Sequence, residues 1–463
     1  MTITSMLFLL LFLPSALVIY YIANDGIKEY VLLGESILFY ALGDIHYLPL
    51  FCIAICLMIF IGRGIHISNS TLLKRILLVL GLIINIGILF SYKYLGSIIE
   101  PDTIRATTAI MPLGLSFFTF KSISYLADAY TGKVSLSEHM VHDALYLSIF
   151  TQIQAGPLTR YNDMQRSKKF DSALFSDGVY RFLIGFSKKI LIADVLSKIT
   201  TEVFATSIDN LSTGYAWLGA VCYSLQLFFD FAGYSDMAIG LTQMFGYKCR
   251  ENFYYPYMTN SVSEFWRRWH ISLSEWFRDY VYIPLGGSRN KQKWRTYVNL
   301  LIVWILTGIW HGSSWNFVLW GLGYFIMIAF EKATNFPAKL NTTVGKILYK
   351  IVCLLFINFQ WVLFNAGSVT YGLSFIKRMV IGKSVSLANL RALFLLKEYF
   401  FFILIALILC FPIVPWIQSK FKERKVLSGV LELGITIIIV VAFVWALSFV
   451  ISGLNNPFAY ANF

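Results

Sequence analysis

Two histidines stand in contexts that suit acid–base chemistry. His270 lies in a stretch dense in Trp, Tyr, Phe and Arg, and His311 ends a long apolar run just before Gly312. A buried imidazole stays neutral near pH 7 because desolvation disfavours its charged form, and it can then accept a proton from a hydroxyl group. These two side chains are therefore the candidate catalytic residues, although each could also be a histidine that only packs in a protein core.

His270 is expected on a short amphipathic helix. Ser261 and Glu264 have the spacing of a capping box, so the helix should begin there and continue to about Tyr282, before Pro284. Aromatic residues would form a stripe along one side of this helix, with the arginines mainly on the other. An interfacial helix with an aromatic anchor has the same pattern, but such a helix does not require an imidazole on its aromatic side.

His311 is expected at a break between two apolar runs. Gly312 predicts the end of one helix, and Ser314 predicts the start of the next. Each flanking run is about 13–16 residues long, which is shorter than the roughly 20 apolar residues that cross a bilayer. The break should then lie within the membrane, where irregular backbone is tolerated only if it is buried in protein or lines a cavity.

The composition excludes a soluble enzyme and a disordered chain. Of the 463 residues, 57% are hydrophobic and 14% are charged, against about 25% charged residues in an ordinary soluble domain. Disordered chains are poor in the bulky apolar residues that are abundant here. Apolar runs recur along the whole chain, and a requirement of ~20 residues for each crossing gives roughly eleven spans. The predicted fold class is all-α, a polytopic membrane protein with additional short re-entrant and interfacial helices.

The charge distribution indicates membrane topology rather than nucleic-acid binding. Lys and Arg number 38 against 25 Asp and Glu, which gives a formal net charge of +13. Basic residues concentrate in three loops, 160–169, 289–295 and 420–425, which should share the cytoplasmic side. The same side chains could recognise an anionic ligand. His139 and His142 have the spacing of one helical face, but the HExxH arrangement is absent and no third ligand is evident, so no metal site is expected.

The segment 230–316 is the most promising place for an active site. Ionisable residues such as Asp230, Asp236 and Arg267 are interleaved there with Trp, Tyr and Phe. Charged groups at membrane depth are energetically costly, and those that occur there usually have a function.

Several long motifs in and around this segment identify a family. The most specific are EFWRRWHISLSEWFRDYVYIPLGG at 264–287 and GIWHG at 308–312. The motifs GYSDMAIG at 233–240, ENFYYPY at 251–257 and QAGPLTRY at 154–161 fit the same pattern. Together they closely resemble the membrane-bound O-acyltransferase (MBOAT) family, and the resemblance covers nearly the whole chain. The similarity is to its bacterial branch of polysaccharide acetylation proteins, typified by proteins of alginate and peptidoglycan O-acetylation.

The resemblance implies an MBOAT fold, in which helices surround a thinned centre crossed by a tunnel. An acyl thioester from the cytosol and an acceptor from the other side would meet in that tunnel. The resemblance also implies that His311 is the catalytic histidine, which we assign as the general base. His270 lies about forty positions before it and would line the same tunnel as an orienting partner. The chain would form a single membrane domain, 1–463. Its catalytic core would lie at about 107–330, and its peripheral helices at 1–100 and 345–455.

Further residues are assigned on this basis. Six are expected to bind substrate or to wall the tunnel against water, which would otherwise hydrolyse a thioester: Trp269, Trp310, Trp315, Tyr234, Asp236 and Arg267. Four basic side chains are expected to meet the phosphates of coenzyme A: Arg289, Lys291, Lys293 and Arg295.

The resemblance predicts transfer of an acetyl group from cytosolic acetyl-CoA across the membrane to a hydroxyl acceptor. The acceptor would lie on an extracytoplasmic SGNH-type O-acetyltransferase partner, for O-acetylation of a polysaccharide such as peptidoglycan or alginate. The chain would be a multi-pass protein of the bacterial inner membrane, in contact with lipid, with no tightly bound cofactor, no metal and no nucleic-acid partner.

Two other functions stay open at this point. A transporter or flippase of a cell-envelope polysaccharide system could use the histidines to relay protons. Many transporters are built from two related halves, and no internal repeat is visible in this sequence. A non-enzymatic membrane scaffold is the other alternative.

Overall fold

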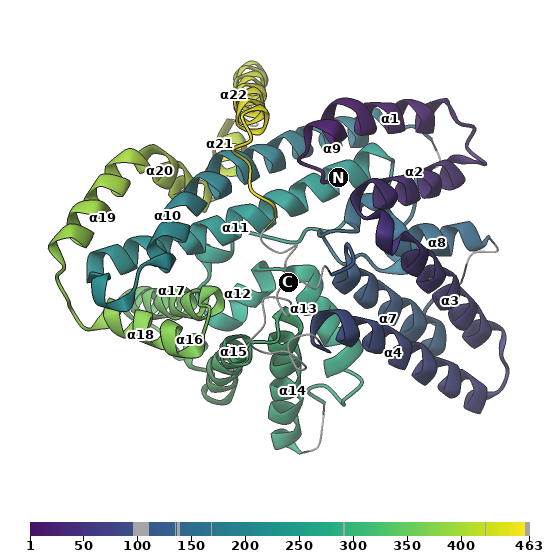
Figure 1. The fold of residues 1–463 in the computed structure, drawn as a ribbon, viewed down its shortest axis with the longest axis horizontal. Helices are drawn as coiled ribbons and strands as arrows, with labels where there is room; N and C mark the ends of the chain where they lie inside the picture. Colours follow the sequence, from purple (N-terminus) through teal and green to yellow (C-terminus); the bar gives the residue numbers. More distant parts are fainter. Residues whose placement is uncertain are drawn as a thin grey trace. The chain divides into compact units, whose positions relative to one another are not determined.

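The computed structural model describes residues 1–95, 111–134, 136, 139–167, 169–289, 292–421 and 423–458. Helices follow one another through these ranges, and no β-strand occurs within them (Figure 1). The prediction of an all-α protein is therefore confirmed. The predicted start of the catalytic core, at residue 107, lies outside the described residues.

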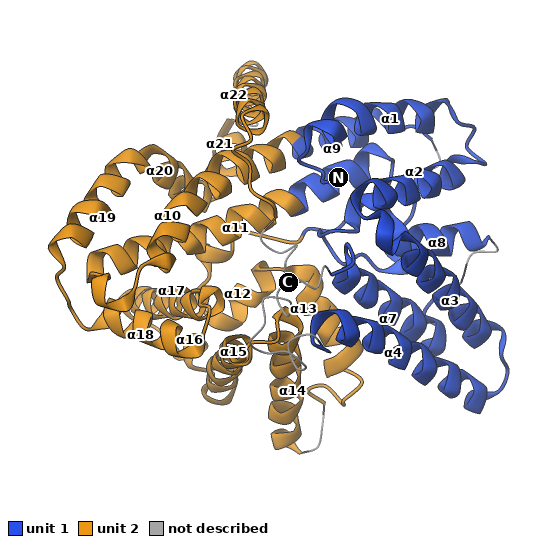
Figure 2. Cartoon of the chain, in the orientation of Figure 1, with its two compact units in different colours: residues 1–182, 235–251 blue, residues 183–234, 252–463 orange. Residues whose placement is uncertain are grey.

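The chain divides into two compact units, which are coloured separately in Figure 2. Unit 1 consists of residues 1–182 and 235–251. Its helices are α1 (Leu13–Ile22), α2 (Lys28–Gly43), α3 (Leu48–Ile67), α4 (Thr71–Lys93), α7 (Leu115–Thr131) and α8 (Met140–Ser148). Two longer helices have residues in both units: α9 (Ser172–Ser187) and α11 (Thr213–Met244).

Unit 2 consists of residues 183–234 and 252–463 and contains both candidate histidines. Its helices up to the second histidine are the π-helix η5 (Lys188–Ala193), α10 (Asp194–Ala205), α12 (Val262–Arg268), α13 (Ile271–Phe277), the π-helix η8 (Arg278–Tyr282) and α14 (Lys293–His311). The helices that follow are α15 (Trp315–Thr334), α16 (Phe336–Lys339), α17 (Thr343–Asn365), α18 (Val369–Val380), α19 (Ser386–Glu398), α20 (Phe400–Leu409), α21 (Ile413–Phe421) and α22 (Lys425–Ile451).

Several helices are long and apolar enough to cross a bilayer. Among the described residues five pass this criterion: Ile45–Ile67, Thr71–Lys93, Trp315–Thr334, Thr343–Asn365 and Val426–Ile451. The helices α19 and α20 together form a sixth candidate, with a bend of 67° between them. Repeated apolar helices of this length confirm a multi-pass membrane protein, because a hydrocarbon core about 30 Å thick requires roughly 20 residues of helix.

The break after His311 occurs where the sequence predicts it. Helix α14 ends at His311, and α15 begins at Trp315. The two helices have 19 and 20 residues, so both are longer than the apolar runs, because polar residues such as Lys293 and Glu331 extend their outer ends. The expectation that each helix is too short for a bilayer is therefore wrong for α15.

Glycines allow α14 and α15 to pack closely. A Cβ atom on Gly308 would lie 2.5 Å from the Phe317 carbonyl oxygen, and one on Gly321 would lie 2.4 Å from the Trp304 carbonyl oxygen. Side chains at these two positions would push the helices apart. The close backbone contact holds the C-terminal turn of α14, which carries His311, against α15.

Candidate active site

His270 lies at a sharp break between two helices, and not within a continuous one. Ser261 caps α12 as predicted, since its hydroxyl accepts a hydrogen bond from the Glu264 N–H at 3.0 Å. Helix α12 then ends at Arg268, and His270 adopts a left-handed conformation with φ 45° and ψ 53° before α13 begins. The predicted single helix from Ser261 to Tyr282 is therefore wrong. A non-glycine residue in this conformation costs about 1–3 kcal/mol and such residues cluster at functional sites.

The segment after residue 251 causes the break. In a continuous helix the Ser272 N–H would donate to the Arg268 carbonyl. Instead the Arg268 carbonyl accepts from Tyr254 N–H at 2.9 Å, and Ser272 N–H donates to Asn252 Oδ1 at 3.3 Å. The Ile271 N–H donates to the Asn252 carbonyl at 2.9 Å. Tertiary hydrogen bonds have thus replaced the helical ones, which the local sequence alone does not indicate.

The His270 imidazole is fully enclosed. His270 is 1% exposed, and its Nδ1 lies 3.1 Å from Asn252 Oδ1. Among the described residues its Nε2 has no hydrogen-bond partner. Burial lowers the pKa of the imidazole from 6.5 to about 3, because desolvation penalises the charged form. His270 is therefore neutral at physiological pH.

Aromatic side chains pack against the faces of this imidazole. Phe231 of α11 meets the ring edge to face, with centroids 4.5 Å apart, and Phe253 lies at 6.5 Å. Phe231 in turn contacts Phe458, near the end of the described chain, at 5.9 Å, and Phe458 stacks on Tyr234 at 4.3 Å. The C-terminal segment thus packs, through Phe458, on the aromatic residue that contacts His270.

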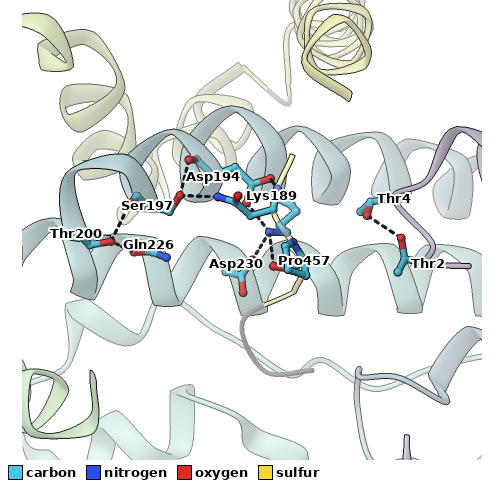
Figure 3. Close-up of polar contacts among 10 residues, drawn as sticks. Thr2, Thr4, Lys189, Asp194, Ser197, Thr200, Gln226, Asp230 and Pro457 are labelled. Atoms are coloured by element: carbon cyan, nitrogen blue, oxygen red, sulfur yellow. Dashed lines mark hydrogen bonds and ion pairs between the residues drawn. The ribbon is translucent and has the colours of Figure 1, made fainter. Parts of the chain in front are cut away.

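A buried ion triad holds this C-terminal segment in place (Figure 3). Lys189 of η5 lies between two carboxylates: it pairs with Asp194, and with Asp230 at 2.8 Å. The same ammonium group contacts the Pro457 carbonyl at 3.5 Å, and Asp194 Oδ2 accepts from the Asn456 N–H at 3.2 Å. The Lys189 side chain is 2% exposed. Polar groups with so little access to water stabilise a structure only when they are paired, so the tail and the triad depend on each other.

His311 occupies an aromatic enclosure of its own. It is 2% exposed, and its ring lies 4.6 Å from Trp310, 5.0 Å from Trp320 and 5.1 Å from Phe364. These rings come from three different helices, α14, α15 and α17. The imidazole is therefore shielded from bulk water by rings of three helices.

A path of aromatic contacts joins the two histidines. The His270 ring lies 6.5 Å from Phe253, and Phe253 lies 5.2 Å from Trp269. Trp269 in turn contacts Trp361 of α17 at 4.9 Å. Trp361 lies 6.1 Å from Trp320 and 5.6 Å from Phe364, and both of these rings touch His311. The structure therefore places the two predicted catalytic residues in one aromatic cluster of unit 2.

Glu331 fixes the start of α12 and was not identified from the sequence. Its carboxylate accepts from the N–H groups of Val262 and Ser263 at 2.7 and 2.8 Å and from the Tyr349 hydroxyl at 2.8 Å. A carboxylate at a helix N-terminus satisfies backbone donors that would otherwise be unpaired. Helix α12 is thus tied to α15 and α17, which carry the rings around His311. The only sequence signal was one acidic residue at the end of an apolar helix.

A cavity of about 590 Å³ opens beside α12, within the 300–1,000 Å³ range of small-molecule sites. Its lining includes three cations, Arg267, Arg278 and Lys332, the indole rings of Trp266 and Trp304, and the carboxylate of Glu331. Lys332 Nζ also lies 3.2 Å from Ser288 Oγ at its rim. Trp304 contacts Trp320 at 6.1 Å, and Trp320 contacts His311. The cavity therefore has three cations in its lining, and its Trp304 ring contacts the rings around His311, but neither histidine lines the cavity itself.

The predicted substrate residues are distributed unevenly. Arg267 lines the cavity, Trp269 and Trp310 belong to the aromatic cluster, and Tyr234 stacks on Phe458. Trp315, expected as a wall residue, is 75% exposed at the first position of α15. Its ring is therefore on the surface of the unit and not among the rings around His311. Asp236 lies in unit 1, where it pairs with Arg181 at 2.9 Å.

The predicted basic block does not line this cavity. Arg289, Lys293 and Arg295 are exposed, and none of these three described residues lines the cavity. Lys291 lies outside the described residues. Lys293 begins α14 and His311 ends it, so at 1.5 Å per residue the two are about 27 Å apart along the helix. The cations close to the aromatic cluster are instead Arg267, Arg278 and Lys332.

Comparison with known sequences places this site in a family context. The model of the MBOAT, membrane-bound O-acyltransferase family, matches residues 60–376. That range includes both histidines, the cavity and the whole aromatic cluster.

Individual relatives agree with this match. A protein of Azotobacter vinelandii named "Probable alginate O-acetylase AlgI" is 39% identical over 387 residues, which cover 80% of this chain and 76% of the relative. The "Peptidoglycan O-acetyltransferase" of Helicobacter pylori is 34% identical over 429 residues, covering 83% of this chain and 80% of the relative. The "Teichoic acid D-alanyltransferase" of Bacillus subtilis is 31% identical over 272 residues, 54% of this chain and 68% of the relative. All three names describe the transfer of an acyl group.

Proposed function

Because the chain belongs to the membrane-bound O-acyltransferase family and is an acyltransferase, we propose that it serves the O-acetylation of an extracytoplasmic polysaccharide. Peptidoglycan and alginate are the polymers named in its relatives, and either is a suitable final acceptor. The observation that carries this proposal is the pair of buried imidazoles joined by one aromatic cluster beside a cation-lined cavity.

The proposed reaction is direct transfer from a thioester to a hydroxyl group. The hydroxyl oxygen attacks the acetyl carbonyl carbon, a C–O bond forms, the C–S bond breaks, and coenzyme A leaves as the thiolate. His311 takes the hydroxyl proton as general base and can return it to the leaving sulfur. His270 is neutral and hard to protonate, so it suits hydrogen bonding to a substrate better than storage of the proton.

The aromatic cluster supports this chemistry by excluding water. Water would compete with the acceptor hydroxyl and release free acetate. Trp310, Trp320 and Phe364 surround His311 closely, so bulk solvent has little access to the base.

We place the donor, acetyl-CoA, in the cavity beside α12. Coenzyme A carries several negative charges, and Arg267, Arg278 and Lys332 at the cavity supply complementary ones. The apolar part of the cavity, formed by Trp266 and Trp304, would accompany the pantetheine arm toward His311. No tightly bound cofactor is required for this reaction.

We further propose that the acceptor reaches the site from the opposite side of the bacterial inner membrane. The MBOAT arrangement of about eleven spans around a central tunnel would allow donor and acceptor to meet there. The immediate acceptor would be a hydroxyl group of an extracytoplasmic SGNH-type partner, which passes the acetyl group to the polymer.

The test is label transfer with purified components. The chain in lipid nanodiscs is incubated with acetyl-labelled acetyl-CoA and the SGNH-type protein produced by the same bacterium. We expect labelled partner and free coenzyme A in equal amounts. Absence of labelled partner, with a folded chain and a folded partner, would contradict the proposed route. Passage of a polysaccharide across the membrane without acetyl-CoA would support a transporter instead.

A further inference from the structure

We propose that Asn252 is a positioning residue that holds His270 as the tautomer protonated on Nδ1, so that Nε2 presents a lone pair to a substrate. The inference rests on the proposed function, because it gives His270 one defined role in the acetyl transfer. It concerns a residue on the loop before α12, well separated in sequence from both histidine motifs.

The orientation of the Asn252 amide is fixed by an obligatory donor. The backbone N–H of Ser272 points at the amide atom labelled Oδ1, at 3.3 Å, and the Ser272 hydroxyl lies 2.8 Å from the same atom. A backbone N–H can only donate, so the atom that it faces must be the amide oxygen and cannot be the amide nitrogen.

The amide oxygen then determines the tautomer of His270. Nδ1 of the imidazole lies 3.1 Å from this oxygen. Since a carbonyl oxygen only accepts, Nδ1 must carry the proton to form the hydrogen bond. A neutral imidazole carries one proton, so Nε2 is left with its lone pair.

The remaining nitrogen is available to a ligand. Among the described residues Nε2 of His270 is buried and has no hydrogen-bond partner. A buried polar atom without a partner costs about 1–3 kcal/mol, and a substrate group that donates to it recovers this cost. The chemistry that Nε2 recognises is an O–H or N–H donor other than the attacking hydroxyl, whose single proton goes to His311, such as an amide of the pantetheine arm.

Backbone geometry supports a functional origin of this arrangement. His270 adopts the left-handed conformation, with φ 45°, and Asn252 binds the N–H groups of the two residues that follow it, Ile271 and Ser272. A continuous helix would avoid this conformation. The strained arrangement has the effect of turning the imidazole toward the Asn252 side chain, as expected for a site that is organised before the substrate binds.

The first experiment reads the tautomer directly. The chain contains six histidines, so ¹⁵N-histidine labelling gives few signals, and the His270 signal is the one lost in His270→Gln. We expect a protonated Nδ1 and an unprotonated Nε2 in the resting protein, although free neutral histidine favours the opposite tautomer. A protonated Nε2 in the unaltered protein would overturn the proposal without any activity measurement.

Variants of Asn252 test the cause. In Asn252→Leu the acceptor oxygen is removed, and we expect His270 to change to the Nε2-protonated form and kcat to fall by about 10²-fold. Asn252→Asp keeps an oxygen at this position, so it should retain the Nδ1-protonated form and exceed the leucine variant in kcat. Asn299→Leu is the matched control, because Asn299 is a buried asparagine that binds the carbonyls of Leu285 and Gly287.

The outcomes separate this inference from the proposed function. An unchanged tautomer in Asn252→Leu, or the same tautomer change in Asn299→Leu, would overturn the role of Asn252. The tautomer could respond as expected while neither the native protein nor any variant transfers acetyl groups. In that case the role of Asn252 in positioning His270 is supported and the proposed reaction is refuted.

Discussion

Replacing Lys189 with methionine is expected to destabilise unit 2 and to release the C-terminal segment. Methionine has nearly the same length as lysine but no charge, so the substitution removes the cation of the buried triad with little change in volume. Asp194 and Asp230 would then face each other without a counter-ion, and the Pro457 carbonyl would lose its contact with the ammonium group.

The magnitude follows from the burial of the group. The Lys189 side chain is 2% exposed, and those of Asp194 and Asp230 are each 3% exposed. Removing one partner of a buried ion pair typically costs about 3–5 kcal/mol. Each factor of ten in the unfolding equilibrium corresponds to about 1.36 kcal/mol. The ratio of unfolded to folded protein should therefore rise by roughly two to four orders of magnitude.

The assay is equilibrium unfolding by SDS titration in mixed micelles. Lys346→Met is the matched control, since Lys346 is an exposed lysine of the same unit, and surface substitutions usually change stability by less than ~0.5 kcal/mol. In Lys189→Met/Asp230→Asn one of the two uncompensated carboxylates is also neutralised. This double variant should recover part of the lost stability.

The reasoning would be refuted by a Lys189→Met protein as stable as Lys346→Met. It would also be refuted if Asp230→Asn destabilised the Lys189→Met background further, because that result would mean that Asp230 is not an uncompensated charge there. A destabilised single variant with partial recovery in the double variant is the pattern that the triad predicts.

Other perturbations test neighbouring parts of the site. Phe458→Ala removes the ring that packs on Phe231, so it should lower kcat for acetyl transfer. Phe458→Leu should retain more activity. Equal activity in both variants and the native protein would contradict a role for the C-terminal segment. Arg267→Ala and Lys332→Ala should raise the KM for acetyl-CoA, and this increase should shrink at high salt because the charges are screened; a salt-independent effect would argue against phosphate contacts. The pKa of His270 is lowered by burial to about 3, so stability should be full above about pH 6.5 and fall below it, by at most ~1.36 kcal/mol per pH unit. The decline should be smaller in His270→Gln, and an identical pH dependence would contradict the depressed pKa.

The sequence was sufficient for those features that depend on local signals. Ser261 and Glu264 gave the start of α12, and Gly312 gave the end of α14. Composition and apolar runs gave an all-α membrane protein, because the bilayer imposes a strong and simple constraint on segment length. The motifs around His270 and His311 gave the family.

Features that depend on contacts between distant segments were missed. The break at His270 arises from hydrogen bonds with Asn252 and Tyr254, and no glycine or proline marks it in the sequence. The role of Glu331 depends on the distance between α15 and α12, which sequence spacing does not provide. Arg278 and Lys332 line the cavity together with the predicted Arg267, but they come from two other elements. The basic residues 289, 291, 293 and 295 are conspicuous in the sequence because they alternate within one short stretch.

The residues predicted to contact substrate differ in where the structure places them. Trp269 and Trp310 directly precede the two histidines and belong to the aromatic cluster. Trp315 is the first residue of α15, after the break, and it is 75% exposed. Direction around a helix changes by about 100° per residue, so closeness in sequence does not fix the side that a residue faces.

The central claim is that His311 is the base of an acetyl transfer, and it is tested most directly by label transfer with His311→Gln. Glutamine keeps a polar side chain of similar reach but cannot accept a proton near neutral pH. With acetyl-labelled acetyl-CoA and the SGNH-type partner, we expect no measurable labelled partner from a folded His311→Gln protein, and measurable transfer from His270→Gln. Normal transfer by folded His311→Gln would contradict the claim.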